Sequence, residues 1–159
     1  VAACDIAIAT RTATFRLSEV KIGIIPAMIS PYVISAMGER QARRYMLSGE
    51  EFDAAEAWRT GLVHDIVEEP GLATRVGEML GQLYTSGPRA VQTIKQLIPQ
   101  SAHSPIGPGI VAETSKIIAD LRATPEAQEG LSAFLEKRKP SWTEAPKAVK
   151  KAAGKRKKG

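Results

Sequence analysis

Cysteine and histidine are scarce in this sequence, which has one cysteine, Cys4, and two histidines, His64 and His103, among 159 residues. A single cysteine cannot close an internal disulfide, and so few ligating side chains predict no metal centre. The sequence also lacks the roughly 18 consecutive apolar residues of a membrane helix and both standard glycine-rich phosphate loops. These absences exclude secreted disulfide scaffolds, zinc fingers and integral membrane proteins. They predict a cytoplasmic protein with no membrane partner and no metal.

Acidic residues are missing from the end of the chain. Seven of the 22 lysines and arginines lie from Ala145 onward with no acid among them, so residues 1–144 carry 15 bases against 17 acids. The net charge of +5 therefore belongs to the tail and not to a folded basic face. We expect residues 143–159 to form a basic, disordered tail. Nucleic acid is not an expected partner, except for weak contact through this tail.

The order of predicted elements places strands near the start and helices after them. Ser30 followed by Pro31 predicts a capped helix that stops near Gly38, and Asp53 with Glu56 forms a capping-box pattern. Thr124 followed by Pro125 predicts the start of a last helix, which Pro140 ends. Extended segments are predicted at about 4–9, 14–17 and 62–67, and further helices at 71–85, 88–98 and 105–123. This order is typical of the back half of an α/β domain with a helical appendage.

Glu19 is the acid whose neighbours are most apolar. It follows an extended segment and is flanked by Leu17, Val20 and Ile22. Apolar surroundings disfavour the charged form of a carboxylate, a property of groups that transfer protons near neutral pH. The other acids lie at helix ends or in charged runs, where we expect caps or solvated faces. His64 is expected to be an ordinary strand histidine and Cys4 a small buried residue.

Four segments occur in order along the chain: ACDIAIAT, ATFRLSEVKIGIIP, SGEEFDAAEAWRTGLVHDIV and EGLSAFLEKRKPSW. Together they resemble the second half of a crotonase (enoyl-CoA hydratase/isomerase) family subunit, over about residues 1–142. The resemblance implies a crotonase-like (ClpP/crotonase) α/β fold. Residues 1–70 would be the C-terminal part of its α/β core, and residues 71–142 a helical region for oligomerisation and coenzyme A contact. The family's assembly implies a homotrimer or hexamer.

The resemblance also implies an activity, the addition of water across the double bond of a 2-enoyl-CoA thioester. Glu19 then matches a catalytic glutamate that acts on the water and on the proton delivered to the α-carbon. Ser18, Pro26, Ala27 and Met28 match substrate-binding positions, and Phe134 and Lys137 match coenzyme A contacts of the final helix. No separate cofactor is implied, because coenzyme A is part of the substrate. Two alternatives stay open: an enoyl-CoA isomerase, and a non-catalytic remnant that acts through oligomer contacts.

Two departures from the family pattern bear on these expectations. The segment Ala27-Met28-Ile29-Ser30 stands where family hydratases usually have a glycine-rich stretch, so we expect an acyl pocket of different shape that suits a branched or bulkier acyl group. The chain also opens directly on an apolar extended segment at Val1, which predicts a truncated subunit. The family's oxyanion-hole segments would precede Val1, and loss of one such donor costs about 10² to 10³ in rate. We therefore expect the 159-residue chain alone to be inactive.

Overall fold

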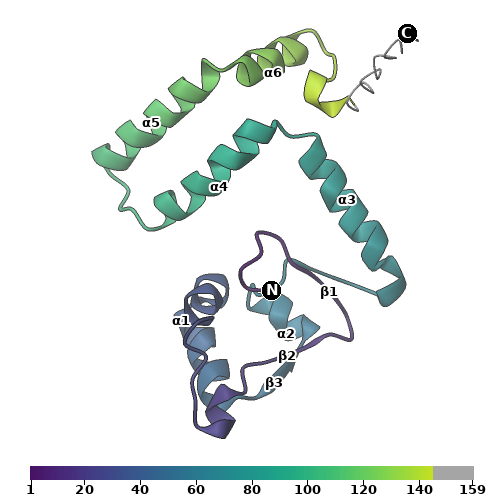
Figure 1. The fold of residues 1–159 in the computed structure, drawn as a ribbon, viewed down its shortest axis with the longest axis vertical. Helices are drawn as coiled ribbons and strands as arrows, with labels where there is room; N and C mark the ends of the chain where they lie inside the picture. Colours follow the sequence, from purple (N-terminus) through teal and green to yellow (C-terminus); the bar gives the residue numbers. More distant parts are fainter. Residues whose placement is uncertain (145–159) are drawn as a thin grey trace, which may run out of the picture. The chain divides into compact units, whose positions relative to one another are not determined.

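The computed structural model describes residues 1–144, and the chain divides into two compact units. The first unit is Val1–Leu80, and the second begins at Gly81. The first unit is mixed α/β and the described part of the second is helical, as Figure 1 shows. Strands near the start followed by helices confirm the predicted fold class.

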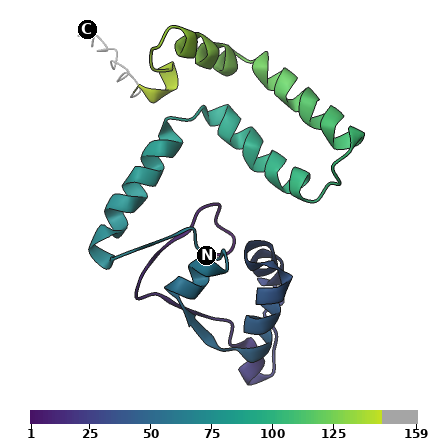
Figure 2. The same cartoon turned by 180° about the vertical axis from the view of Figure 1, so that it is seen from behind.

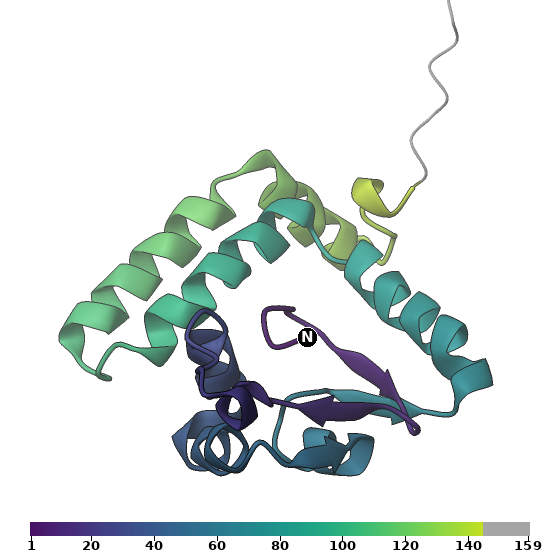
Figure 3. The same cartoon turned by 60° about the horizontal axis from the view of Figure 1, so that its bottom comes forward.

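Four short strands pair in the first unit (Figure 3). β1 (Ile8–Thr10) runs parallel to β4 (Asp65–Val67), with Ala9 opposite Ile66. β2 (Thr14–Arg16) runs antiparallel to β3 (Glu51–Asp53), with Phe15 opposite Phe52. Both pairs join segments that are distant in sequence, so this unit depends on long-range contacts.

The helices of the first unit are η1 (Glu19–Ile22), α1 (Ser30–Ser48), α2 (Ala54–Arg59) and η2 (Glu69–Gly71). α1 is two helical stretches joined at Gly38, whose φ of 76° and ψ of 158° are not helical. The predicted stop near Gly38 is therefore confirmed as a kink. At α2 the Asp53 side chain accepts a hydrogen bond from the Glu56 N–H at 2.9 Å, so the predicted cap is confirmed.

The core of the first unit lies between α1, α2 and the strands. Tyr45, at 1% exposed, is its largest fully buried side chain, and its ring centre is 4.1 Å from that of Phe52. Phe15 stacks on Phe52 from the other strand of the pair. The remaining buried apolar residues are Ala9, Val33, Met37, Ala42, Ala54, Ala57, Leu62 and Val63. This core holds the start of α1, and therefore the segment that leads into it, in place.

The other helices are α3 (Leu72–Tyr84), α4 (Pro88–Ala102), α5 (Pro108–Arg122), α6 (Pro125–Leu135) and η3 (Ser141–Thr143). α4 and α5 run in opposite directions, as Figure 2 shows. The Glu126 carboxylate of α6 accepts hydrogen bonds from the N–H groups of Arg89 and Ala90, at 2.9 and 3.0 Å. A side chain of one helix thus caps the first turn of another, where a negative charge is also favoured by the helix dipole.

Several sequence-based expectations are wrong in detail. The first strand begins at Ile8 instead of about residue 4, and Cys4 is exposed in a turn rather than buried. Residues 62–64 precede β4 instead of belonging to it, because β4 extends only as far as its pairing with β1. The N-cap of α1 is Ile29, and Ser30 is the first helical residue, with its hydroxyl donating to the Ala27 carbonyl at 2.9 Å.

The last helix also differs from its prediction, because α6 ends at Leu135, before Pro140. Among the helices within residues 1–144, none has the length and apolarity needed to cross a membrane. The predicted basic tail lies outside the described residues from Ala145 onward.

Candidate active site

Glu19 begins η1, the short 3-10 helix that follows β2. Gly23 ends this helix with a φ of 78°, a conformation that favours glycine, and its N–H is directed at the carbonyls of Glu19 and Val20. The N–H of Ile24 donates to the Glu19 carbonyl at 3.2 Å. These backbone bonds fold the following loop against η1 and fix the position of the Glu19 backbone.

The side chain of Glu19 presents an unusual polar atom. Its Oε2 is buried and has no hydrogen-bond partner within residues 1–144, the only side-chain oxygen or nitrogen in that range of which this is true. Buried polar atoms in folded proteins are nearly always paired, and an unpaired one at a functional site points to a catalytic or binding role. Glu19 is therefore the strongest candidate for a reacting group in the described chain.

The four predicted substrate-binding residues flank η1. Ser18 directly precedes it and is exposed, while Pro26, Ala27 and Met28 lie in the loop between η1 and α1. Pro26 is buried, and Met28 is 90% exposed. The loop is tied to α1 by the bond from the Ser30 hydroxyl to the Ala27 carbonyl. Ser18 and the Pro26–Met28 stretch thus belong to one continuous segment around Glu19.

An apolar cavity of about 240 Å³ lies between this segment's flanks and the core. Leu17, two residues before Glu19, and Ile29, just after Met28, both line it. Its other lining residues are Val1, Ala2, Ala3, Phe15, Arg16, Tyr32, Val33, Met37, Phe52 and Leu62. A cavity of this composition suits an apolar group, and its volume is below the roughly 300–1,000 Å³ of drug-sized sites.

The predicted coenzyme A contacts lie in the second unit. Phe134 projects from the last turn of α6 and is 80% exposed, as expected of a side chain free to stack on a ligand. Lys137 is exposed but not helical: its φ of 54° makes it the one non-glycine residue with a positive φ among residues 1–144. The expectation that Lys137 belongs to the final helix is wrong, because the backbone turns there after Leu135.

Sequence reasoning missed the network that holds this turn. Arg138 makes a two-pronged ion pair with Glu129, at 2.6 and 2.9 Å, and Glu129 also accepts from the Ser141 N–H at 2.9 Å. The Arg138 guanidinium, with that N–H, holds the pKa of Glu129 down at about 2. The Trp142 ring lies against Gly130, where an added Cβ would come within 2.9 Å of it. The sequence signal for this turn was the pair of opposite charges at Glu129 and Arg138, nine residues apart on either side of the helix end.

The remaining sequence candidates have structural roles. The Nδ1 of His64 accepts a hydrogen bond from the Ala7 N–H at 3.1 Å, while the His64 N–H donates to the Ala7 carbonyl at 2.7 Å. His64 therefore joins the segment before β4 to the segment before β1. Among residues 1–144, no group of three histidine, cysteine, aspartate or glutamate side chains could hold a metal ion.

Comparison with known proteins identifies the class to which this fold and site belong. The model of the enoyl-CoA hydratase/isomerase family matches residues 1–145. The chain belongs to the enoyl-CoA hydratase/isomerase family. The resemblance seen in the sequence, and with it the crotonase-like fold, is confirmed.

Three individual proteins illustrate the similarity. The chain is 33% identical over 141 residues to the "Probable enoyl-CoA hydratase echA8" of Mycobacterium bovis and 32% identical over 140 residues to the 2,3-dehydroadipyl-CoA hydratase of Escherichia coli. These alignments cover 88% and 87% of this chain, and 54% of each relative. The crystal structure of an enoyl-CoA hydratase from Shewanella pealeana superposes with a TM-score of 0.84 at 44% identity, covering 89% of this chain and 52% of that one. The chain thus spans about half the length of the relatives it matches.

Proposed function

We propose that the complete protein containing this chain adds water across the double bond of a 2-enoyl-CoA thioester, with Glu19 as its acid/base. The observation that carries the proposal is the buried, unpaired Oε2 of Glu19. Membership of the enoyl-CoA hydratase/isomerase family supports the reaction class. Because family members share a fold and differ in reaction, the residue and not the fold has to support the chemistry.

In the proposed reaction the Glu19 carboxylate accepts a proton from water as the oxygen forms a bond to the β-carbon. The carbon–carbon π electrons then move toward the thioester, and a proton returned from Glu19 forms the new bond at the α-carbon. Backbone N–H groups that hold the thioester oxygen would favour the enolate-like transition state. We assign these donors to the part of the protein that corresponds to the half of its relatives this chain does not cover.

The apolar cavity beside Leu17 is the proposed site of the acyl group. Its volume of about 240 Å³ and its single tyrosine and single arginine favour a short acyl group over a long straight chain. The Ala27–Met28 stretch stands where the family pattern is glycine-rich and leads directly into the lining residue Ile29, which favours a branched group. Turnover of a branched 2-enoyl-CoA should exceed that of crotonyl-CoA, and the reverse order would contradict this assignment.

Phe134 and Lys137 are the proposed contacts for the nucleotide end of coenzyme A. The exposed ring can stack on adenine, and the exposed ammonium can pair with a phosphate as a point charge.

We also propose a trimeric or hexameric assembly, which the uncovered apolar side chains of α4 and α5 support. An unpaired, exposed Cys4 suits a reducing compartment, so we propose a cytoplasmic location.

Replacement of Glu19 by glutamine in the complete protein tests the proposal. The substitution keeps the shape of the side chain and removes its acid/base function, so kcat should fall by about 10²- to 10⁴-fold. Binding of free coenzyme A, measured by calorimetry, should change little because Glu19 acts on the acyl end. Glu51→Gln, which neutralises an exposed acid of β3, serves as the matched control.

Product analysis separates the two reactions of the family. Formation of a 3-hydroxyacyl-CoA identifies a hydratase, while a shifted double bond without uptake of water identifies an isomerase. If Glu19→Gln leaves turnover unchanged, Glu19 does not belong to the mechanism. If neither product forms with any short enoyl-CoA, the non-catalytic alternative replaces the proposal.

A further inference from the structure

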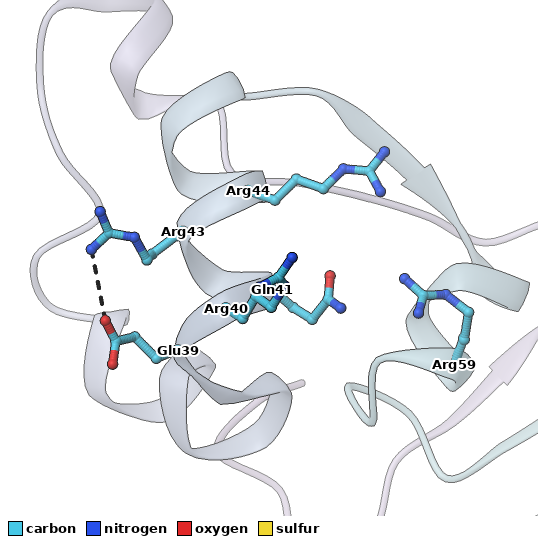
Figure 4. Close-up of a pocket in the computed structure, with 6 residues that line it drawn as sticks. All are labelled: Glu39, Arg40, Gln41, Arg43, Arg44 and Arg59. Carbon is cyan, nitrogen blue, oxygen red and sulfur yellow. Dashed lines mark ion pairs between the residues drawn. The ribbon is translucent and has the colours of Figure 1, made fainter.

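A second concave site lies on α1 beyond its kink, facing the end of α2. Six residues line this hollow of about 730 Å³, which we call the arginine hollow: Glu39, Arg40, Gln41, Arg43, Arg44 and Arg59. Figure 4 shows the Gln41 side chain directed toward that of Arg59. Four of the six residues are arginines, and none is apolar. None belongs to the segment around Glu19, so the proposed hydration does not account for the hollow.

Two of the arginines are held in place by ion pairs with carboxylates that do not themselves line the hollow. The Arg59 Nη2 lies 2.5 Å from a Glu56 oxygen, and the Arg44 Nε lies 2.7 Å from a Glu50 oxygen. Hydrogen bonds from Arg59 and from the Tyr45 hydroxyl hold the pKa of Glu56 at about 2, so this anchor stays ionised. The Arg44 guanidinium also lies over the Tyr45 ring, 5.0 Å from its centre. These contacts orient two guanidinium groups before any ligand arrives.

Arg40 is different, because its side chain makes no ion pair or hydrogen bond with any residue of the described range 1–144. Its neighbour Arg43 is weakly engaged, 3.7 Å from Glu39, and turns away from Arg59 (Figure 4). The hollow therefore combines two fixed guanidinium groups with one whose donors are uncommitted. The Gln41 amide adds a further donor at the same place.

We propose that the arginine hollow binds a diphosphate group. A lining without apolar side chains does not suit an acyl chain. A guanidinium group can donate two parallel hydrogen bonds to two phosphate oxygens, and it remains charged at all relevant pH values. Three of the four arginines are paired with Glu39, Glu50 or Glu56, so Arg40 supplies the uncompensated positive charge. The oriented N–H groups of Arg44 and Arg59 add directed hydrogen bonds to an anionic ligand. The diphosphate could be inorganic pyrophosphate or the diphosphate of a nucleotide, which share this recognition chemistry.

Calorimetric titration of the complete protein with inorganic pyrophosphate tests the proposal at a fixed ionic strength of about 0.1 M. Arg40→Gln should weaken pyrophosphate binding by about tenfold, because it removes charge-assisted hydrogen bonds to the ligand. Since Arg40 has no partner among the described residues, this variant breaks no internal bond, and its melting temperature should match that of the parent.

Arg122→Gln is the matched control, because it removes the same charge from an exposed position of α5 outside the hollow. Its affinity for pyrophosphate should stay within about twofold of the parent. The basic tail and Lys137 add equally to all three proteins, so the contrast between the two variants isolates the hollow. Equal losses of pyrophosphate affinity in both variants would show that the effect comes from the net charge of the protein and would overturn the proposal. An absence of pyrophosphate binding to the parent would overturn it as well.

A titration with ADP distinguishes the two sources of the diphosphate. If ADP and pyrophosphate bind alike and both depend on Arg40, the diphosphate alone is recognised; tighter, Arg40-dependent ADP binding identifies a nucleotide. Glu19→Gln should leave pyrophosphate binding intact. Failure of the hydration proposal and failure of this one therefore give different results.

Discussion

At the scale of single residues, Tyr45 links the core to the charged surface. Its ring is buried against Phe52, and its hydroxyl donates a hydrogen bond to the Glu56 carboxylate. Burial, followed by that bond, raises the pKa of Tyr45. Tyr45→Phe should lower the free energy of unfolding by about 1–3 kcal/mol, because it removes a hydrogen bond to a charged group. Urea unfolding at neutral pH measures this, and an unchanged midpoint would show that the bond contributes nothing.

Glu56 makes the stability of the first unit depend on pH. The pKa of Glu56 in the folded chain is about 2, below its ordinary value of 4.5, because Arg59 and Tyr45 bind its ionised form. A lowered pKa means that these bonds stabilise the fold fully above about pH 5 and are lost as the pH falls through 2. Glu56→Gln should therefore be less stable than the parent at pH 7, and the difference should shrink toward pH 2.

Urea unfolding of both proteins across this pH range is the measurement. Glu51→Gln controls for the loss of one negative charge, since Glu51 is exposed on β3 and its carboxylate forms no ion pair within residues 1–144. A difference between parent and Glu56→Gln that stays constant with pH would contradict the assigned role. The arginine hollow would also lose its anchor under those conditions, because Glu56 orients Arg59.

At the scale of elements, the kink of α1 requires glycine at position 38. The φ of 76° and ψ of 158° of Gly38 lie in a region that is essentially restricted to glycine. An added Cβ would meet no atom within 4 Å, so a substitution there is penalised by backbone strain alone. Gly38→Ala should lower the free energy of unfolding by about 1–3 kcal/mol.

Gly77→Ala is the same chemical change as Gly38→Ala, but it should raise the free energy of unfolding instead of lowering it. Gly77 lies inside α3, and a Cβ there would likewise meet nothing within 4 Å. Alanine in a helix interior is favoured over glycine by about 0.5–1 kcal/mol, so this variant should be more stable than the parent. Thermal unfolding followed by circular dichroism compares the two. Stabilisation by both substitutions would show that the kink carries no strain for alanine.

Local signals explain which elements the sequence predicts well. Asp53 and Thr124 cap their helices as expected, because a cap depends only on residues within one turn. The strands are less predictable, since β1 and β4 are defined by pairing across more than fifty residues. Cys4 illustrates the consequence: its apolar neighbours predict a buried strand, but the strand begins only where β4 is available as a partner.

For the candidate site, too, local sequence indicates some features and only the folded chain shows others. The apolar sequence around Glu19 identifies the residue, but only the folded chain shows that one carboxylate oxygen is buried without a partner among the described residues. The end of α6 was predicted too late in the sequence because the bonds of Glu129 to Arg138 and to the Ser141 N–H compete with continuation of the helix. The arginine hollow likewise requires α1 and α2 to be placed side by side, which no local pattern encodes.

At the scale of the whole molecule, the two units bury very different amounts of apolar surface. The first has a core centred on Tyr45, whereas only Thr124 and Ala133 are buried from residue 81 to residue 144. Apolar side chains of α4 and α5 remain about half exposed, with Ile94 at 48%, Ile98 at 60% and Ile118 at 54%. Apolar stripes of this kind on soluble proteins mark surfaces that another chain segment or subunit covers.

We expect a second subunit to cover the stripe of α4, consistent with the proposed trimer or hexamer. Ile98→Lys in the complete protein should then shift its mass in sedimentation velocity toward that of one subunit, because burying an unpaired ammonium opposes association. Gln96→Lys adds the same charge to an exposed position about 200° around the helix and should leave the assembly intact. A parent protein that sediments as a single subunit would contradict the expected assembly. Equal dissociation by both variants would attribute the effect to net charge instead of to the apolar face of α4.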